Sequence, residues 1–144
     1  MKRILIVDDD RAFLESLAGI LKSQGYSVDV AETGREAIDK SKETYYNLAL
    51  LDIRLPDMDG TELLRLIDGH LPKTVKIIVT GYPSVENAVK ALNMNADGYV
   101  TKPTNPLELL GIIRKKLQDQ EEADRALGEK VKEWIERCAK QQEA

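Results

Sequence analysis

Three short runs of apolar residues constrain the fold more than any other feature of this sequence. They occupy residues 4–7, 48–51 and 77–79. None has the polar residue at every second position that a strand with one solvated face shows, and each is too short for a buried helix. Apolar runs of this length are typical of strands buried on both faces, as in a parallel sheet covered by helices on each side.

The segments between these runs supply the helices that such a sheet needs. Candidate strands span residues 3–7, 27–31, 47–51, 75–79 and 98–101. Amphipathic helical patterns span residues 11–23, 34–44, 60–68 and 84–93, and a further one begins at Pro106. Gly25, Gly34 and Pro83 separate neighbouring elements, as glycine and proline commonly do. This alternation predicts a doubly wound α/β domain with a five-stranded parallel sheet.

Composition narrows the class of protein. The chain has 144 residues, of which 42% are hydrophobic and 32% charged, a balance that suits one globular domain with a short remainder. No apolar run approaches the roughly 20 residues of a membrane span, and the N-terminus is a poor signal peptide. The single cysteine, Cys138, excludes an internal disulfide framework, and the net charge of −4 argues against nucleic-acid binding. We expect a cytoplasmic protein with no membrane insertion and no nucleic-acid partner.

Reactive side chains gather where the candidate strands end. In chain order these are Asp8, Asp9, Asp10, Asp52, Thr80 and Lys102. In open α/β sheets, ligands bind outside the carboxyl ends of the strands. The residues at these ends are therefore expected to contribute to one site.

Their chemistry suits a divalent cation beside a phosphoryl group. Asp8, Asp9 and Asp52 can share a Mg²⁺ ion, which prefers oxygen ligands and would relieve the repulsion between the acids. A carboxylate is also a competent nucleophile toward phosphorus. Lys102 and Thr80 would then contact phosphoryl oxygens through a charge-assisted bond and a hydroxyl. Because phosphoryl transfer is mostly positioning and charge neutralisation, these groups form a nearly sufficient set.

The chain resembles the response-regulator receiver domain of two-component signalling. Four stretches carry the resemblance, in the family's order and spacing: ILIVDDD, LALLDIRLPDMDG, KIIVTG and DGYVTKP. Together they cover about residues 2–118. The resemblance implies a flavodoxin-like (βα)5 fold with strand order 2-1-3-4-5. The residues that follow it are expected to form an extended C-terminal helix. We expect a receiver domain over residues 1–118 and a helical extension, or the start of a signalling linker, over residues 119–144.

The resemblance also implies roles for individual residues. Asp52 matches the phospho-acceptor, which takes its phosphoryl group from a histidine kinase. Asp8 and Asp9 match the acidic pair that holds Mg²⁺ together with Asp52 and the backbone carbonyl of Arg54. Lys102 matches the lysine that contacts the phosphoryl group.

Further positions match the family's switch and loops. Thr80 matches the hydroxyl that moves toward the phosphoryl group, and Tyr99 matches the aromatic residue that swings inward with it. Pro103 matches a proline that follows a cis peptide bond. Gly60 matches a position in the loop after Asp52 where a side chain would obstruct the turn.

Two bulky residues are expected to set the lifetime of the phosphoryl group. Arg54 lies two residues beyond Asp52, and Tyr82 lies two residues beyond Thr80. In this family, these positions influence access of the hydrolytic water. We therefore expect slowed self-dephosphorylation.

Three residues are expected to lie outside this chemistry. Asp10 is one acid more than the motif needs, and we expect it to cap the helix that begins near Arg11. His70, near the end of the third helical pattern, is expected on the solvated surface. Cys138 is expected to act as a small hydrophobic residue on a helix face.

The tail continues the apolar pattern of the fifth helix at alternating spacings of three and four. The positions are Leu110, Ile113, Leu117, Leu127, Val131, Trp134 and Cys138, a heptad seam. The polar residues Gln120 and Asp124 interrupt it. Three interpretations stay open: a long projecting helix that pairs with a partner, a separate short helix folded back on the domain, or a partly frayed linker. Trp134 argues against a frayed linker, because a lone Trp is usually covered.

The combined hypothesis is a phosphorylation-dependent signalling switch. Such a protein catalyses only its own phosphorylation and dephosphorylation and is otherwise not an enzyme. Phosphorylation of Asp52 would alter the surface made by the fourth helix, the fifth strand and the fifth helix, and so change binding to an output protein or domain. Homodimerisation through that surface, or through the C-terminal helix, is a further expectation.

Two other classes of function stay open. A phosphatase of the haloacid-dehalogenase type also uses strand-end carboxylates, a hydroxyl, a lysine and Mg²⁺, with Asp8 as its nucleophile. The acidic pair that this class needs after Lys102 is missing from the sequence. A phosphorylation-independent coiled-coil adaptor would depend on the tail and not on Asp52.

Overall fold

The computed structural model of the chain describes residues 1–67 and 72–143. Within this part of the chain, strands β1 to β5 span Arg3–Val7, Ser27–Ala31, Leu48–Leu51, Val75–Thr80 and Gly98–Thr101. The helices α1, α2, α4 and α5 span Arg11–Ser23, Gly34–Glu43, Val85–Asn93 and Pro106–Glu143. The sheet is parallel throughout, with strand order β2-β1-β3-β4-β5, which confirms the flavodoxin-like arrangement.

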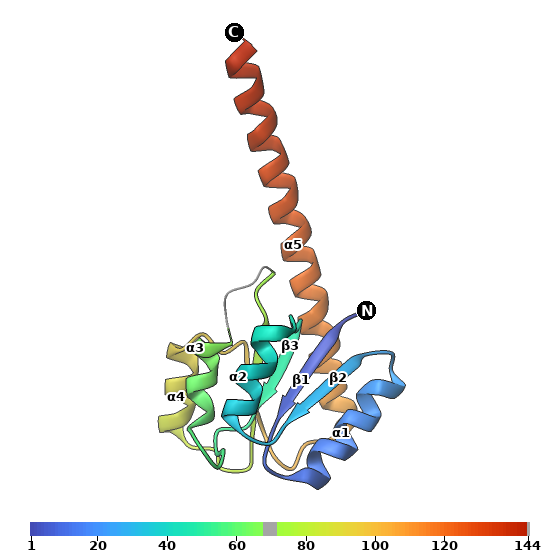
Figure 1. Cartoon of the computed structure of the whole chain (residues 1–144), viewed down its shortest axis with the longest axis vertical. Helices are drawn as coiled ribbons and strands as arrows, with labels where there is room; N and C mark the ends of the chain where they lie inside the picture. Colours follow the sequence, from blue (N-terminus) through green and yellow to red (C-terminus); the bar gives the residue numbers. More distant parts are fainter. Residues whose placement is uncertain (68–71, 144) are drawn as a thin grey trace.

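Helices lie on both faces of this sheet (Figure 1). A hydrophobic cluster lies between the sheet and the helices on each side. Along β1, Ile4 and Ile6 face a core built with α1 and α5, whereas Leu5 and Val7 face a core built with α2, α3 and α4. Successive strand residues point to opposite faces, so both faces of the strand need apolar side chains. This two-sided burial explains the continuous apolar runs in the sequence.

Side-chain caps fix where the helices begin. Asp10 accepts a hydrogen bond from the backbone N–H of Phe13, which confirms that it caps α1. Thr33 caps α2 in the same way. Ser84 caps α4 and exchanges reciprocal bonds with Asn87, so the helix begins one residue later than the sequence pattern suggested.

The third helix differs from its prediction, which placed it over residues 60–68. A 3-10 turn, η1, spans Gly60–Glu62, and α3 spans only Leu63–Leu66. The turn forms because the Asp59 carboxylate accepts bonds from both the backbone N–H and the hydroxyl of Thr61. Ile67 follows α3 as its C-cap and is not helical, whereas Asp68, the last residue of the predicted helix, and His70 lie outside the described residues.

The C-terminal segment forms one continuous helix, α5, which leaves the domain as a rod (Figure 1). Its first half packs on the core through Leu109, Leu110, Ile113 and Leu117. This arrangement excludes a separate helix folded back on the domain. No described helix is long and apolar enough to cross a bilayer.

Gln120, the first polar interruption of the seam, anchors α5 at the point where it leaves the sheet. Its side-chain amide donates to the backbone carbonyls of Asn47, at 2.9 Å, and Lys73, at 2.8 Å. These carbonyls lie just before β3 and β4. Gln120 is buried and donates the hydrogen bonds that these carbonyls need. A leucine at this position has no donor for them.

Candidate functional site

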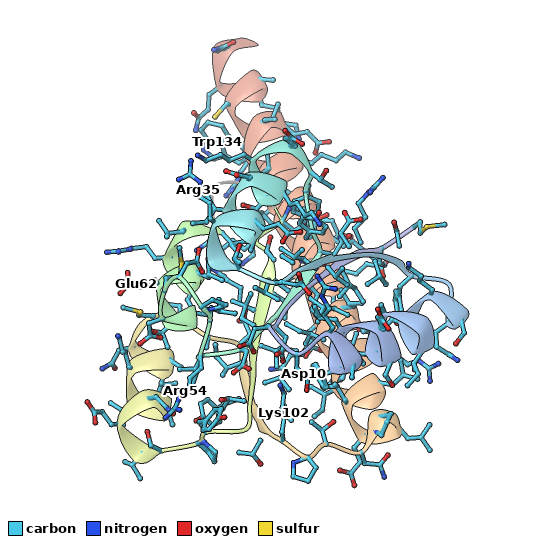
Figure 2. All side chains as sticks on the ribbon, turned by 60° about the horizontal axis from the view of Figure 1, so that its bottom comes forward. Asp10, Arg35, Arg54, Glu62, Lys102 and Trp134 are labelled. Carbon is cyan, nitrogen blue, oxygen red and sulfur yellow. The ribbon has the colours of Figure 1, made fainter. Side chains whose placement is uncertain are left out.

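The strand register brings the predicted site residues to one edge of the sheet. Val7 pairs with Leu51, so the next residues, Asp8 and Asp52, come out side by side. Thr80 pairs with Thr101, so Lys102 follows directly on the neighbouring strand. Figure 2 shows Asp10, Arg54 and Lys102 at this end of the domain, far from Trp134 on α5.

Three carboxylates form the floor of the site. Asp8, Asp9 and Asp52 each offer an oxygen atom, and these oxygens all lie within 4.8 Å of one another. Asp8 and Asp52 are buried, with 1% and 4% of their surface exposed, whereas Asp9 is exposed. The donor set consists only of hard oxygen atoms, which fits Mg²⁺. Asp10 is engaged in capping α1 and does not belong to this group of three.

Lys102 supplies the positive charge among these acids. Its ammonium group donates to Asp8 and lies 3.5 Å from Oδ2 of Asp52. Burial raises the pKa of Asp8 above its ordinary value, and the hydrogen bond from Lys102 offsets this only in part. Burial alone would lower the pKa of Lys102, but its two carboxylate partners outweigh that effect and raise it. Lys102 is therefore held as a cation.

An aromatic ring that sequence reasoning missed also contacts this lysine. The Phe13 ring on α1 lies under the Lys102 ammonium group, 4.2 Å from nitrogen to ring centroid. A cation held over a ring face is attracted by the electron-rich face. Sequence alone gave no signal for this contact, because the two residues meet only when α1 packs beside the end of β5.

Thr80 is fully buried at the end of β4. Its hydroxyl oxygen accepts a hydrogen bond from the backbone N–H of Tyr82 at 3.1 Å. The Thr80 carbonyl accepts a bond from the backbone N–H of Lys102 at 2.8 Å. Backbone hydrogen bonds therefore fix both the Thr80 side chain and the main chain of Lys102 at this end of the sheet.

The loop after Asp52 turns back sharply. Gly60 donates its backbone N–H to the carbonyl of Ile53 at 2.6 Å, and Arg54 and Asp59 pair as an antiparallel bridge. A Cβ atom on Gly60 would lie 1.7 Å from the carbonyl oxygen of Asp52. The turn after the acceptor position therefore has no room for any side chain at Gly60.

Arg54 and Tyr82 contact each other beside the site. The Arg54 guanidinium carbon lies 3.9 Å from the centroid of the Tyr82 ring. Both side chains are exposed and come from the loops that follow β3 and β4. The sequence singled out both residues for their expected effect on the phosphoryl lifetime, but it did not predict that they contact each other.

Tyr99 connects β5 to α4. Its hydroxyl donates to the side-chain oxygen of Asn87, and the Asn87 amide donates to the carbonyl of Tyr82 at 2.9 Å. Asn87 is a second residue that sequence reasoning missed. The peptide bond between Lys102 and Pro103 is cis, as expected at Pro103.

A profile of the response regulator receiver domain matches residues 4–114. Among curated proteins, the cell cycle response regulator CtrA of Brucella ovis is 39% identical over 111 residues, which make up 77% of this chain and 48% of CtrA. The chain therefore spans about half the length of the curated relatives it matches.

Two solved structures are also similar. One is a CheY-like receiver domain protein from Methanospirillum hungatei, with 51% identity and a TM-score of 0.82 over 85% of this chain and 98% of that one. The other is a response regulator from Burkholderia pseudomallei, with 28% identity and a TM-score of 0.74 over 89% of this chain and 75% of that one. The Burkholderia structure contains a phosphorylated aspartic acid, a calcium ion and citrate.

Proposed function

This chain belongs to the response regulator receiver domain family, and from that premise we propose that it is a switch phosphorylated on Asp52 by a histidine kinase. One observation carries the proposal. The Asp52 carboxylate lies among two further acids and 3.5 Å from the Lys102 ammonium group, at the carboxyl edge of the sheet. This arrangement can hold a divalent cation and a phosphoryl group together.

In the proposed reaction, a carboxylate oxygen of Asp52 attacks the phosphorus atom of a phosphohistidine. The new O–P bond replaces the P–N bond, whose electron pair returns to the imidazole of the donor. Lys102 binds a phosphoryl oxygen, and Asp8 and Asp9 with the Arg54 carbonyl hold the cation site. When bound, Mg²⁺ neutralises charge on the transferring group. The protein then acts on no substrate other than its own phosphoryl group.

The switch begins at Thr80. A phosphoryl group adds about two negative charges and three acceptor oxygens. Its oxygens can accept a bond from the Thr80 O–H, while the Thr80 oxygen accepts from the Tyr82 N–H, so a Thr80 side chain drawn toward the phosphoryl group shifts the Tyr82 loop with it. Because Asn87 contacts both the Tyr82 carbonyl and the Tyr99 hydroxyl, a shift of this loop changes the contacts that hold Tyr99 and the start of α4.

The surface that would read this change lies on α4. Three of its apolar side chains, Val85, Val89 and Leu92, are exposed on the described structure. An exposed apolar patch of this kind is a common docking surface for another protein. We infer that this patch, with β5 and the start of α5, meets the output partner.

Amide NMR spectra test the switch. Wild-type protein with Mg²⁺ and beryllofluoride, which mimics a phosphoryl group, should show shifted amide signals along α4 and β5. Asp52→Asn should show none of these shifts under the same conditions. Spectral changes that persist in Asp52→Asn would contradict the assignment of Asp52 as the acceptor.

The projecting half of α5 supports a second proposal, that two copies pair through it. Leu127, Val131 and Trp134 recur at heptad spacing, and 61% of the Trp134 surface is exposed. Lys130 and Arg137 flank the seam on the same side. An antiparallel pair would bring these two cations opposite each other, so we expect a parallel dimer.

Sedimentation equilibrium tests this pairing. Val131→Asp should weaken self-association about tenfold or more, because it places a charge in the centre of the seam. Glu129→Gln, on the outer face of the same helix, is the matched control. Equal association of both variants would exclude the seam as the interface.

A further inference from the structure

Asp57, at the tip of the loop that follows the acceptor strand, makes contacts that phosphoryl chemistry does not require. Its two carboxylate oxygens accept bonds from the backbone N–H groups of Gly34, at 2.8 Å, and Arg35, at 2.9 Å. These are the first two residues of α2. The carboxylate therefore reaches across from one βα loop to the first turn of a different helix.

Helix α2 has a cap of its own, so this remote carboxylate is an addition. The hydroxyl of Thr33 accepts from the N–H of Glu36 at 3.1 Å. Asp57 supplies acceptors for the two N–H groups that Thr33 leaves over, and its negative charge lies at the positive end of the helix. The N–H donors of Arg35 and Gly34 lower the pKa of Asp57, so it remains ionised.

The side chain of the neighbouring Met58 also lies against the start of α2. A Cβ atom on Gly34 would lie 2.4 Å from the Met58 sulfur, so the loop tip lies directly against the helix start. Polar and apolar contacts thus hold the tip of the loop to α2 together.

Backbone contacts close the base of this loop. These are the Arg54–Asp59 bridge and the 2.6 Å bond from Gly60 to Ile53. Pro56, whose φ angle is fixed by its ring, lies between Arg54 and Asp57. Asp57 and Arg54 are therefore joined by a short segment with few free backbone angles, through which a shift of one can reach the other.

We propose that Asp57 is a positioning residue for the cation site, acting by clamping the loop of residues 52–60 to the first turn of α2. This inference rests on the proposed function, in which the Arg54 carbonyl is one of the Mg²⁺ ligands. Residues that orient a ligand commonly change metal affinity by about 10- to 100-fold when they are removed. Because binding linkage is reciprocal, Mg²⁺ also strengthens the clamp.

Titration calorimetry with MgCl₂ tests the clamp on the unphosphorylated protein. Asp57→Ala should raise the Kd for Mg²⁺ about tenfold. Asp57→Asn keeps one acceptor oxygen and should lie between Asp57→Ala and wild type. Thr33→Ala is the matched control, because it removes the other cap of α2, which bonds to Glu36 within the helix and not to the loop carboxylate. Its Kd should equal that of wild type.

Amide hydrogen exchange gives a second measurement that a purely structural cap would not affect. Saturating Mg²⁺ should slow exchange at Gly34 and Arg35 in wild type, and should leave exchange in Asp57→Ala unchanged. If wild type binds Mg²⁺ and Asp57→Ala binds it equally well, the clamp is refuted while the proposed function stands. A similar loss of affinity in Asp57→Ala and Thr33→Ala would assign the effect to α2 and refute the clamp. If wild type binds no Mg²⁺, both proposals fail.

Discussion

The ammonium nitrogen of Lys102 lies 3.5 Å from a carboxylate oxygen of Asp52, although 50 residues separate the two along the chain. The same nitrogen donates to Asp8. Without a metal, Lys102 is therefore the counter-charge of the acidic cluster. A divalent cation bound by the same carboxylates meets this lysine as a competing positive charge.

Replacing Lys102 should separate two effects of this charge. In Lys102→Met, the buried carboxylates lose their partner, so the free energy of unfolding without Mg²⁺ should fall by about 3 kcal/mol. The affinity for Mg²⁺ should rise because the competing cation is gone. The phosphorylation rate should fall about 100-fold, because a donor to the phosphoryl group is lost.

Lys90→Met is the control for the Lys102 variant. Lys90 pairs with Asp59 at 3.3 Å on the surface, where such a pair contributes less than about 1 kcal/mol. Urea unfolding and titration calorimetry measure both variants. Weaker Mg²⁺ binding in Lys102→Met would contradict the competition described here.

Gly60 should tolerate no side chain. In Gly60→Ala, the Cβ atom would lie 1.7 Å from the Asp52 carbonyl oxygen, so we expect a loss of about 3 kcal/mol or more in the free energy of unfolding. Gly111→Ala is the control, since no atom within 4 Å meets a Cβ there and α5 should gain about 1 kcal/mol. Equal stability of the two variants in urea unfolding would show that the loop can relax.

The contribution of Asp57 to stability should depend on pH. Hydrogen bonds from Arg35 and Gly34 lower the pKa of Asp57, so its carboxylate stabilises the fold above its unfolded pKa of about 3.9. The contribution disappears as the pH falls through the lowered folded pKa. Asp57→Ala should cost about 1 kcal/mol at pH 7, as the loss of a helix cap does, and less at pH 3. A difference in unfolding free energy that stays constant between these pH values would contradict this assignment.

The stacked pair of Arg54 and Tyr82 should prolong the phosphorylated state. A cation–π contact at an exposed site contributes about 0.5–1 kcal/mol, so the Arg54→Ala, Tyr82→Ala double variant should lose its phosphoryl group about two to five times faster. Arg65→Ala, an exposed arginine on α3 that pairs with Glu62, is the control. The decay of the phosphorylated protein, followed by mass spectrometry, gives the rates. An unchanged lifetime in the double variant would refute the prediction.

The sheet was predictable from sequence because the patterns that specify its strands and the starts of its helices lie within a few neighbouring residues. The apolar runs around Ile4, Leu50 and Ile77 report two-sided burial directly, and Asp10 and Thr33 mark helix starts through bonds to residues three positions away. The third helix was predicted too long because Asp59 and Gly60 replace its first turn with a 3-10 turn. That choice depends on the Asp59 carboxylate bonding to Thr61, a side-chain contact that apolar periodicity does not record.

The acidic site was predictable because the carboxyl ends of parallel strands all lie at the same edge of the sheet. The residues that hold the site were not, because each acts across the fold. Phe13 reaches Lys102, Asp57 reaches α2, and Asn87 reaches Tyr99, over sequence separations that no local pattern records. In the sequence, Gln120 appeared only as a break in the heptad seam. Its role depends on the backbone carbonyls that precede β3 and β4, which come near it only in the folded protein.

Mass spectrometry after exposure to acetyl phosphate and Mg²⁺ tests the central claim most directly. Wild type should gain one phosphoryl group, located on the peptide that contains Asp52. Asp52→Asn, and wild type with EDTA in place of Mg²⁺, should remain unmodified. A wild-type protein that stays unmodified, or a phosphoryl group found on Asp8, would contradict the account.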